Sequence, residues 1–296
     1  MKERARSVAA ALLAPVRRRW GRRVVNWTPD FMGFGNHLYL WTWAHAGRAG
    51  ELERRVLITD KMRPWAAQVP DFARAHLVNR TDVRLLDQRD HVWARPEEHS
   101  GDPRGFTQES REAFIRECLL PSPLLAGVGG PLGEDDVLTI NARRGDYYSN
   151  AAHRPLHAID LPAYLRLAVR GSVARDGAVR RVHLVSDDIP WCRRELGFLA
   201  DVAAEVTFAD PADPPEQNFR DVCSARRLVL SNSTFSMWGA FVGRVLHGDD
   251  PGKTWAPAFF MSSYGPGRCY EYDQDWSFVD ELPDGWQPDR VVAVTG

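Results

Sequence analysis

One pattern constrains the fold of this 296-residue chain more than any other: short apolar runs alternate with polar or glycine-rich loops and helix-like segments. The apolar runs are rich in β-branched and aliphatic residues, as buried strands are. They cover residues 23–27, 56–59, 137–140, 182–185 and 228–230. Strands that alternate with helices predict an α/β fold with a largely parallel sheet.

Helix-like segments follow three of these runs, at residues 37–46, from Pro190 onward and at residues 235–246. Pro190 stands where a helix accepts proline, in its first turn. A stretch rich in glycine and proline, residues 127–133, is the best linker candidate in the chain. It predicts two lobes of ordinary domain size.

We therefore expect three parts in this chain. Residues 1–23 form a basic N-terminal segment, residues 24–130 an N-terminal lobe, and residues 134–296 a C-terminal lobe.

The N-terminal segment departs from the average composition, with eight Lys or Arg residues and one acid, Glu3. Its apolar stretch, Val8 to Val16, is too short to span a bilayer. Arg17 to Arg19 stand where a signal peptide would have its small-residue cleavage site. Two interpretations stay open: a basic tail or first helix, or a basic amphipathic segment in peripheral contact with an anionic membrane.

Composition excludes some classes of protein. The formal net charge of −1 argues against a nucleic-acid-binding protein that relies on bulk positive charge. The four cysteines lie far apart without a CxxC pair, which fits neither a zinc site nor a dense disulfide framework. A reducing compartment is expected, so we predict a cytoplasmic protein, with any membrane contact on the inner surface.

Polar clusters follow four of the predicted strands. They comprise Gly33 to Asn36, Arg143 to Asp146, Ser186 to Asp188 and Ser231 to Ser236. Ligands of parallel α/β sheets bind beyond the carboxyl ends of the strands. Four clusters at such ends therefore predict a binding site there.

Arg143 and Arg144 offer two guanidinium groups beside Gly145, which permits a close backbone approach. This arrangement suits an anion such as a diphosphate. A surface turn, in which each arginine pairs with a nearby acid, is the commoner explanation for a bare RRGD.

Each of the other clusters has a structural alternative. The hydroxyl and amide groups of Ser231 to Ser236 suit helix capping or an anion site. Ser186 to Asp188 suit either a helix cap or a nucleotide site, in which the carboxylates accept hydrogen bonds from ribose hydroxyls or base amines. The loop Gly33 to Asn36 lacks the third glycine of a dinucleotide fingerprint.

The motifs of several other enzyme classes are missing from the sequence. It has no GxxxxGK[ST] stretch and no HExxH, and we regard the DxD at Asp273 to Asp275 as a chance match. We therefore expect no metal site and no cofactor, and a nucleotide diphosphate bound without metal.

At these residues the sequence resembles the α-1,2-fucosyltransferases of glycosyltransferase family 11. The family reads Gly-x-Gly-Asn-Gln near the N-terminus, His-x-Arg-Arg-Gly-Asp-Tyr midway, Ser-Asp-Asp before a Trp, and Asn-Ser-Thr-Phe-Ser-Trp-Trp-Gly-Ala late. Here the corresponding stretches, in the same order, are residues 33–37, 141–147, 186–191 and 232–240. Four ordered motifs are far more specific than any one of them.

The resemblance implies a GT-B-like fold, in which two Rossmann-like lobes flank a nucleotide-sugar cleft. It implies that residues 24–130 form the lobe on the acceptor side and that residues 134–296 form the lobe that binds the nucleotide sugar. It implies an inverting, metal-independent transfer of fucose from GDP-fucose to a sugar hydroxyl of a glycan acceptor. Arg143 would hold the leaving diphosphate, and Asp146, the nearest carboxylate, is the candidate base. The residues expected to bind the donor nucleotide are Asn36, Asn141, Arg144, Ser186, Asp187, Asp188, Asp221, Asn232, Ser233, Thr234 and Ser236.

Three positions depart from the family pattern. Asn141 replaces a histidine, Met237 a tryptophan and His37 a glutamine. Two rival interpretations remain: a transferase of the same fold that uses another nucleotide sugar, and a non-catalytic nucleotide-sugar-binding protein.

Overall fold

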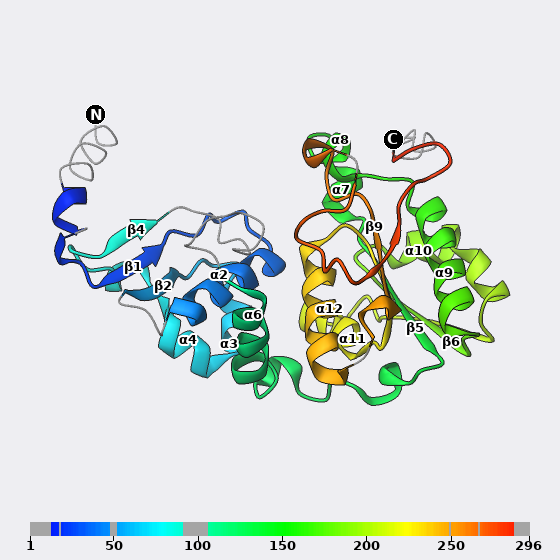
Figure 1. The fold of residues 1–296 in the computed structure, drawn as a ribbon, viewed down its shortest axis with the longest axis horizontal. Helices are drawn as coiled ribbons and strands as arrows, with labels where there is room; N and C mark the ends of the chain where they lie inside the picture. Colours follow the sequence, from blue (N-terminus) through cyan, green and yellow to red (C-terminus); the bar gives the residue numbers. More distant parts are fainter. Residues whose placement is uncertain are drawn as a thin grey trace. The chain divides into compact units, whose positions relative to one another are not determined.

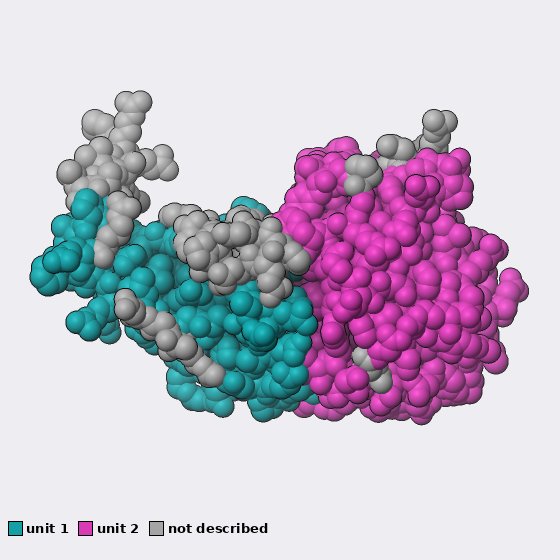
Figure 2. All heavy atoms as spheres, viewed as in Figure 1, with its two compact units in different colours: residues 1–125 teal, residues 126–296 magenta. Residues whose placement is uncertain are grey.

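The computed structural model describes residues 13–17, 19–47, 52–90, 106–248, 250–265 and 267–286. The chain divides into two compact units, Met1–Leu125 and Ala126–Gly296, which Figure 2 shows in separate colours. Each unit is built on its own parallel sheet. The predicted α/β fold with two Rossmann-like lobes is therefore confirmed.

Unit 1 holds a four-stranded sheet in the order β3-β2-β1-β4, in which every neighbouring pair is parallel. Its strands are β1 (Arg23–Asn26), β2 (Glu53–Leu57), β3 (Leu77–Val78) and β4 (Gln88–Asp90). Its helices and helical turns are α2 (Phe34–Ala46), α3 (Arg63–Ala67), α4 (Pro70–His76), η2 (Arg80–Asp82), α6 (Gln108–Phe114), η3 (Ile115–Leu119) and η4 (Pro123–Leu125). The apolar sequence of α2 is buried on nearly all sides, as expected of a helix with no polar face.

Unit 2 holds a six-stranded, fully parallel sheet in the order β10-β9-β8-β5-β6-β7. Its strands are β5 (Val137–Ala142), β6 (Arg181–Ser186), β7 (Glu205–Phe208), β8 (Arg227–Leu230), β9 (Thr254–Pro257) and β10 (Ser277–Val279). Counted along the chain, this is the 3-2-1-4-5-6 order of doubly wound nucleotide-binding sheets.

The helices of unit 2 lie on both faces of this sheet, with α9 and α10 on one side and α11 and α12 on the other (Figure 1). They are α7 (Gly145–Ser149), α8 (Arg154–His157), α9 (Leu161–Asp176), α10 (Ile189–Glu195), α11 (Pro215–Ser224) and α12 (Thr234–His247). Helical turns η5 (Gly130–Gly133), η6 (Gly197–Asp201), η7 (Pro251–Lys253) and η8 (Ser262–Tyr264) complete the unit.

The five strands predicted from apolar runs are confirmed as β1, β2, β5, β6 and β8. The predicted helices are confirmed as α2, α10 and α12, and Pro190 lies in the first turn of α10. β5 and β8 are buried along their whole length, which explains why their sequences are mostly apolar and do not alternate between apolar and charged residues.

Close packing between α11 and α12 depends on a glycine. A Cβ atom on Gly239 would lie 2.4 Å from Cγ1 of Val222, so no larger residue fits without moving one helix. This contact fixes α12, and with it the N-terminal turn that follows β8.

Candidate functional site

The centre of the sheet in unit 2 is its topological switch point. β5 and β8 are neighbours there, but the chain continues from β5 toward β6 and from β8 toward β9 on the other side. Sheets of this type bind ligands beyond the carboxyl ends of the two strands at the switch point. Those ends are Ala142 and Leu230, so the loops that begin at Arg143 and Ser231 occupy the favoured position.

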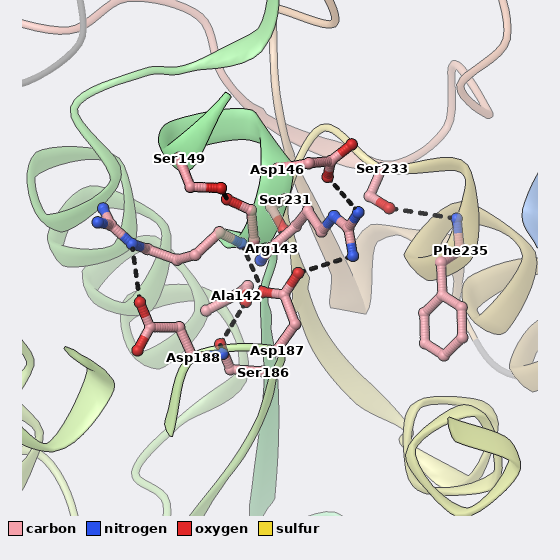
Figure 3. A network of polar contacts seen from close by, with 12 residues as sticks. Ala142, Arg143, Asp146, Ser149, Ser186, Asp187, Asp188, Ser231, Ser233 and Phe235 are labelled. Carbon is pink, nitrogen blue, oxygen red and sulfur yellow. Dashed lines mark hydrogen bonds and ion pairs between the residues drawn. The ribbon is translucent and has the colours of Figure 1, made fainter. Parts of the chain in front are cut away.

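Arg143 extends its guanidinium group between two carboxylates (Figure 3). Nη2 lies 2.5 Å from Oδ1 of Asp146, and Nη1 lies 2.7 Å from Oδ2 of Asp187. The backbone N–H of Arg143 donates to Oγ of Ser231 at 2.8 Å, which ties the loop after β5 to the loop after β8. The side chain of Arg143 is 36% exposed, so it is held in one orientation and still accessible to a ligand.

Arg144, by contrast, is enclosed. Its guanidinium carbon lies 4.0 Å from the ring centroid of Tyr148 and 4.1 Å from that of Trp191, so the group is stacked between two aromatic rings. Nε lies 3.7 Å from Oδ2 of Asp188, an ion pair that completes the enclosure. Burial lowers the pKa of Arg144, against the opposing effect of Tyr148 and Asp188. Its side chain therefore stabilises the loop, and its predicted contact with the donor remains a prediction.

The turn between the arginines and α7 requires glycine. Gly145 has φ of +22°, and a Cβ atom there would lie 2.3 Å from Oδ2 of Asp187. The absence of a side chain lets the carboxylate of Asp187 approach the backbone, where it accepts from the N–H of Arg144 at 2.7 Å.

The cluster after β8 is largely engaged in internal bonds. Ser233 caps α12 by accepting from the N–H of Phe235, and Oγ of Ser236 donates to the carbonyls of Ser231 and Ser233. Asn232 donates to the carbonyls of His157 and Phe260, both at 2.9 Å. The capping interpretation is thus confirmed for Ser233.

Part of the cluster after β6 is also structural. Oγ of Ser186 donates to the carbonyl of Ala142 at 2.6 Å, and Asp188 caps α10 by accepting from the N–H of Trp191. Asn141 donates to the carbonyl of Val185 at 3.3 Å and is buried. Thr234, at the start of α12, is half-buried.

Most of the predicted site residues therefore gather at one edge of the sheet: Asn141, Arg143, Arg144, Asp146, Ser186, Asp187, Asp188, Asn232, Ser233, Thr234 and Ser236. Two do not. Asp221 lies on α11 and faces the middle of β6, with Oδ2 3.3 Å from Nε2 of His183 and Oδ1 accepting from Gln217. Asn36 lies in the first turn of α2 in unit 1. Their predicted roles in holding the donor remain predictions.

Sequence reasoning missed His153, which the structure brings next to Asp146. Nδ1 of His153 lies 3.1 Å from Oδ2 of Asp146, and its side chain is 44% exposed. A histidine seven positions after the aspartate was the available signal, but it falls beyond the RRGDY motif and belongs to no recognised spacing.

Charge at this edge is balanced by pairs. Burial on its own would raise the pKa of Asp146, but the charge and hydrogen bond of Arg143, with the hydrogen bond from His153, leave that pKa below its ordinary value. Within the described residues, no group of three or more His, Cys, Asp or Glu side chains is arranged to hold a metal ion. Asp273 of the DxD is bound to Arg244, and its Oδ1 accepts from the N–H of Asp275, as expected of a structural turn.

Comparison with known proteins gives three findings. Residues 111–250 match the family described as Glycosyl transferase family 11. An alpha-1,2-colitosyltransferase of Escherichia coli is 28% identical over 120 residues, which are 40% of this chain and 39% of that protein. Among solved structures, E. coli heptosyltransferase WaaC with ADP aligns over 89% of this chain and 94% of its own, with 13% identity and a TM-score of 0.45.

The match to the colitosyltransferase thus spans well under two thirds of that protein's length. The family match covers β5 to α12, and with them the arginine loop and the serine-rich turn at the switch point. In sequence, residues 111–250 are therefore similar to glycosyl transferase family 11.

Proposed function

We propose that this chain is a glycosyltransferase that moves fucose from GDP-fucose to a sugar hydroxyl of a glycan, with inversion and without a metal ion. The observation that carries the proposal is the guanidinium of Arg143, oriented and accessible at the switch point of the region that is similar to family 11. Surface-glycan synthesis is the setting we propose for it.

Transfer breaks the bond between the anomeric carbon and the phosphate, so negative charge grows on the departing diphosphate. Preorganised cationic donors stabilise such charge in the transition state. A guanidinium carries five N–H donors, and Arg143 uses two nitrogens to reach carboxylates, so further donors remain for a phosphate. Charge-assisted hydrogen bonds of this kind contribute roughly 1.5–3 kcal/mol each.

The start of α12 supplies a second group of donors. Ser233 satisfies the N–H of Phe235, and the first turn of a 14-residue helix carries further N–H groups with no carbonyl one turn earlier. Its dipole favours an anion at this end. Because α12 follows β8 directly, these donors lie at the same edge of the sheet as Arg143.

The other side chains of this edge are proposed to hold the rest of the donor. Asp187 and Asp188 are proposed to accept from ribose hydroxyls or base amines, and Thr234 to line the phosphate pocket with Ser233 and Ser236. Asn141, which stands where the related family has histidine, still offers an amide that donates and accepts.

Two alternatives follow from particular observations. The relative's name makes colitose a second candidate sugar. Asn141 in place of histidine supports the third candidate, a protein that binds the nucleotide without turnover.

The first experiment is a thermal-shift titration of the purified protein with GDP, UDP and CDP in EDTA, for wild type and Arg143→Ala. Ligand at about 100 times its dissociation constant adds roughly 2.7 kcal/mol to the free energy of unfolding. We expect stabilisation by GDP alone, and its loss in the variant. Stabilisation by UDP instead would exclude fucose as the sugar, and no shift with any nucleotide would contradict the proposal.

Assays with GDP-fucose and GDP-colitose, each with a panel of galactosides, then separate the candidates. Turnover that persists in EDTA is expected for a metal-free enzyme. GDP binding without turnover on any acceptor would favour the non-catalytic alternative.

We further propose that the N-terminal segment makes peripheral contact with an anionic membrane. Residues 1–12 and Arg18 lie outside the described residues, but Trp20 is 69% exposed and Val16 43% exposed beside basic side chains. Leu85 is 66% exposed, and its carbonyl accepts from Nε of Arg17, so Leu85 lies next to the segment that carries Val16 and Trp20. No helix in the described ranges has both the length and the apolarity needed to cross a bilayer.

Co-sedimentation with vesicles tests this contact. We expect binding to phosphatidylglycerol vesicles that weakens with salt and with Trp20→Glu, and little binding to phosphatidylcholine. Equal binding to both lipids, or none to either, would contradict it.

A further inference from the structure

The structure pairs a carboxylate with an imidazole directly beside Arg143. Oδ1 of Asp146 lies 2.5 Å from Nη2 of Arg143, and Oδ2 lies 3.1 Å from Nδ1 of His153. Both oxygens of Asp146 are therefore engaged by neighbours. A carboxylate in this position is better suited to orient an imidazole than to accept a proton from substrate.

The pair is built on a fixed platform made of α7 and α8. The N–H of His153 donates to the carbonyl of Asn150, and the side chain of Arg154 donates to the carbonyl of Tyr148 from Nε at 2.8 Å. The rings of Tyr147 and His157 stack at 4.3 Å with an interplanar angle of 13°. Contacts of this kind restrict the orientation of a side chain, as catalysis requires.

The contact with Asp146 determines the tautomer of His153. A neutral imidazole has one N–H, and a carboxylate opposite Nδ1 keeps the hydrogen there. Nε2 then carries a lone pair, and the structure shows no bond to it from any described residue. The side chain is 44% exposed, so this nitrogen is open to a substrate.

We infer that His153 is the general base of the transfer and that Asp146 is a positioning residue, an inference that rests on the proposed function. Nε2 of His153 takes the proton of the acceptor hydroxyl as its oxygen forms a bond to the anomeric carbon. The bond from that carbon to the phosphate oxygen breaks, and its electron pair leaves with the nucleoside diphosphate. The imidazolium is stabilised by Asp146 until it returns its proton to water, as in other Asp–His pairs.

The geometry also separates the two tasks. Asp146 holds Arg143 with one oxygen and His153 with the other, so the cation for the leaving group and the base lie on different sides of one carboxylate. Inversion requires the acceptor to attack from the face opposite the leaving group. The ring of His157 lies edge-on to that of His153, with the ring centroids 6.3 Å apart.

The test measures GDP released from GDP-fucose, with water and with methyl β-galactoside as acceptors, together with GDP affinity by calorimetry. General-base catalysis contributes typically 10²–10⁴-fold. We expect His153→Ala to lower turnover by about a hundredfold or more, with GDP affinity within about threefold of wild type. Added imidazole should restore at least part of the turnover, which it would not do for a purely structural histidine.

Two further variants sharpen the test. Asp146→Asn should lower turnover and remain insensitive to added imidazole, because the ring is present but misoriented. His247→Gln, at the C-terminal end of α12 and therefore away from the site, serves as the matched histidine control, with near wild-type turnover expected. Nitrogen-15 shifts of the His153 ring should show hydrogen on Nδ1 in the wild type.

The outcomes distinguish this inference from the proposed function. If His153→Ala releases GDP at a rate within threefold of the wild type, the assignment of His153 as the base is overturned and the proposed transferase activity stands. Hydrogen on Nε2 in the wild type would overturn it as well. A wild-type protein that binds GDP and releases none from GDP-fucose with either acceptor would overturn the proposed transferase, and the base with it.

Discussion

Asp187, at the end of β6, holds the side chain of Arg143, at the end of β5, through an ion pair of 2.7 Å between Oδ2 and Nη1. Its other oxygen accepts from the backbone N–H of Arg144 at 2.7 Å. One carboxylate thus fixes both the path of the arginine loop and the direction of its exposed guanidinium. The contact joins neighbouring strands of the sheet, since Ala142 and Ser186 are aligned partners.

This relationship leads to a prediction for Asp187. Asp187→Ala should lower the free energy of unfolding by about 1–3 kcal/mol, because the N–H of Arg144 loses its acceptor. Asp187→Asn, which keeps one oxygen, should cost clearly less. Urea denaturation of both variants measures the difference, and equal losses would show that the backbone contact contributes nothing.

Arg143 is predicted to matter for turnover more than for stability. Arg143→Ala should lower turnover by about ten- to a hundredfold or more, since each lost factor of ten corresponds to about 1.4 kcal/mol. Arg143→Lys should recover only part, because one ammonium cannot replace two guanidinium nitrogens that point at separate partners. Arg170→Ala, at an exposed position on α9, is the matched control. A loss of turnover below threefold in Arg143→Ala would contradict the assignment of Arg143 to the leaving diphosphate.

Arg144 is predicted to behave in the opposite way. Its guanidinium is stacked between Tyr148 and Trp191, and a desolvated cation–π contact contributes about 2 kcal/mol or more. Arg144→Ala should therefore lower the free energy of unfolding by about 2–4 kcal/mol, against less than 1 kcal/mol for Arg143→Ala. Urea denaturation of the two variants side by side measures this, and similar values would contradict the enclosure of Arg144.

Three of the strands that the sequence predicted, β5, β6 and β8, are buried along all or nearly all of their length. They carry β-branched and aliphatic residues, which are typical of buried strands, so a local pattern was enough to predict them. β4, Gln88–Asp90, has no apolar residue at all, and its place beside β1 comes from tertiary contacts that no local pattern records.

That these polar residues gather was equally predictable, since polar residues at the carboxyl ends of parallel strands must meet at one edge of the sheet. Which of them remain available to a ligand was not. Ser186 and Asn232 look like binding residues in sequence, yet their side chains are engaged by carbonyls of neighbouring segments. His153 reaches Asp146 because the turn at Asn150 folds α8 back toward α7. No local sequence pattern records the direction of that turn.

His37 gives a prediction for the pH dependence of stability. Its side chain is 1% exposed, and neither ring nitrogen has a hydrogen-bond partner within the described residues. Burial, with a smaller effect from Lys61, lowers the pKa of His37 to about 4. An imidazole in the unfolded chain has a pKa of about 6.5.

The folded-state pKa of His37 lies below the unfolded one. At a pH between these two values the unfolded chain therefore binds a proton at this residue and the folded chain does not. The free energy of unfolding should therefore fall as pH drops from about 6.5 toward 4, by up to about 3 kcal/mol from this residue. His37→Gln should remove that part of the slope. Urea denaturation of wild type and variant at matched pH values isolates it, since the carboxylates titrate alike in both. Parallel stability curves across this range would show that His37 takes up its proton without unfolding.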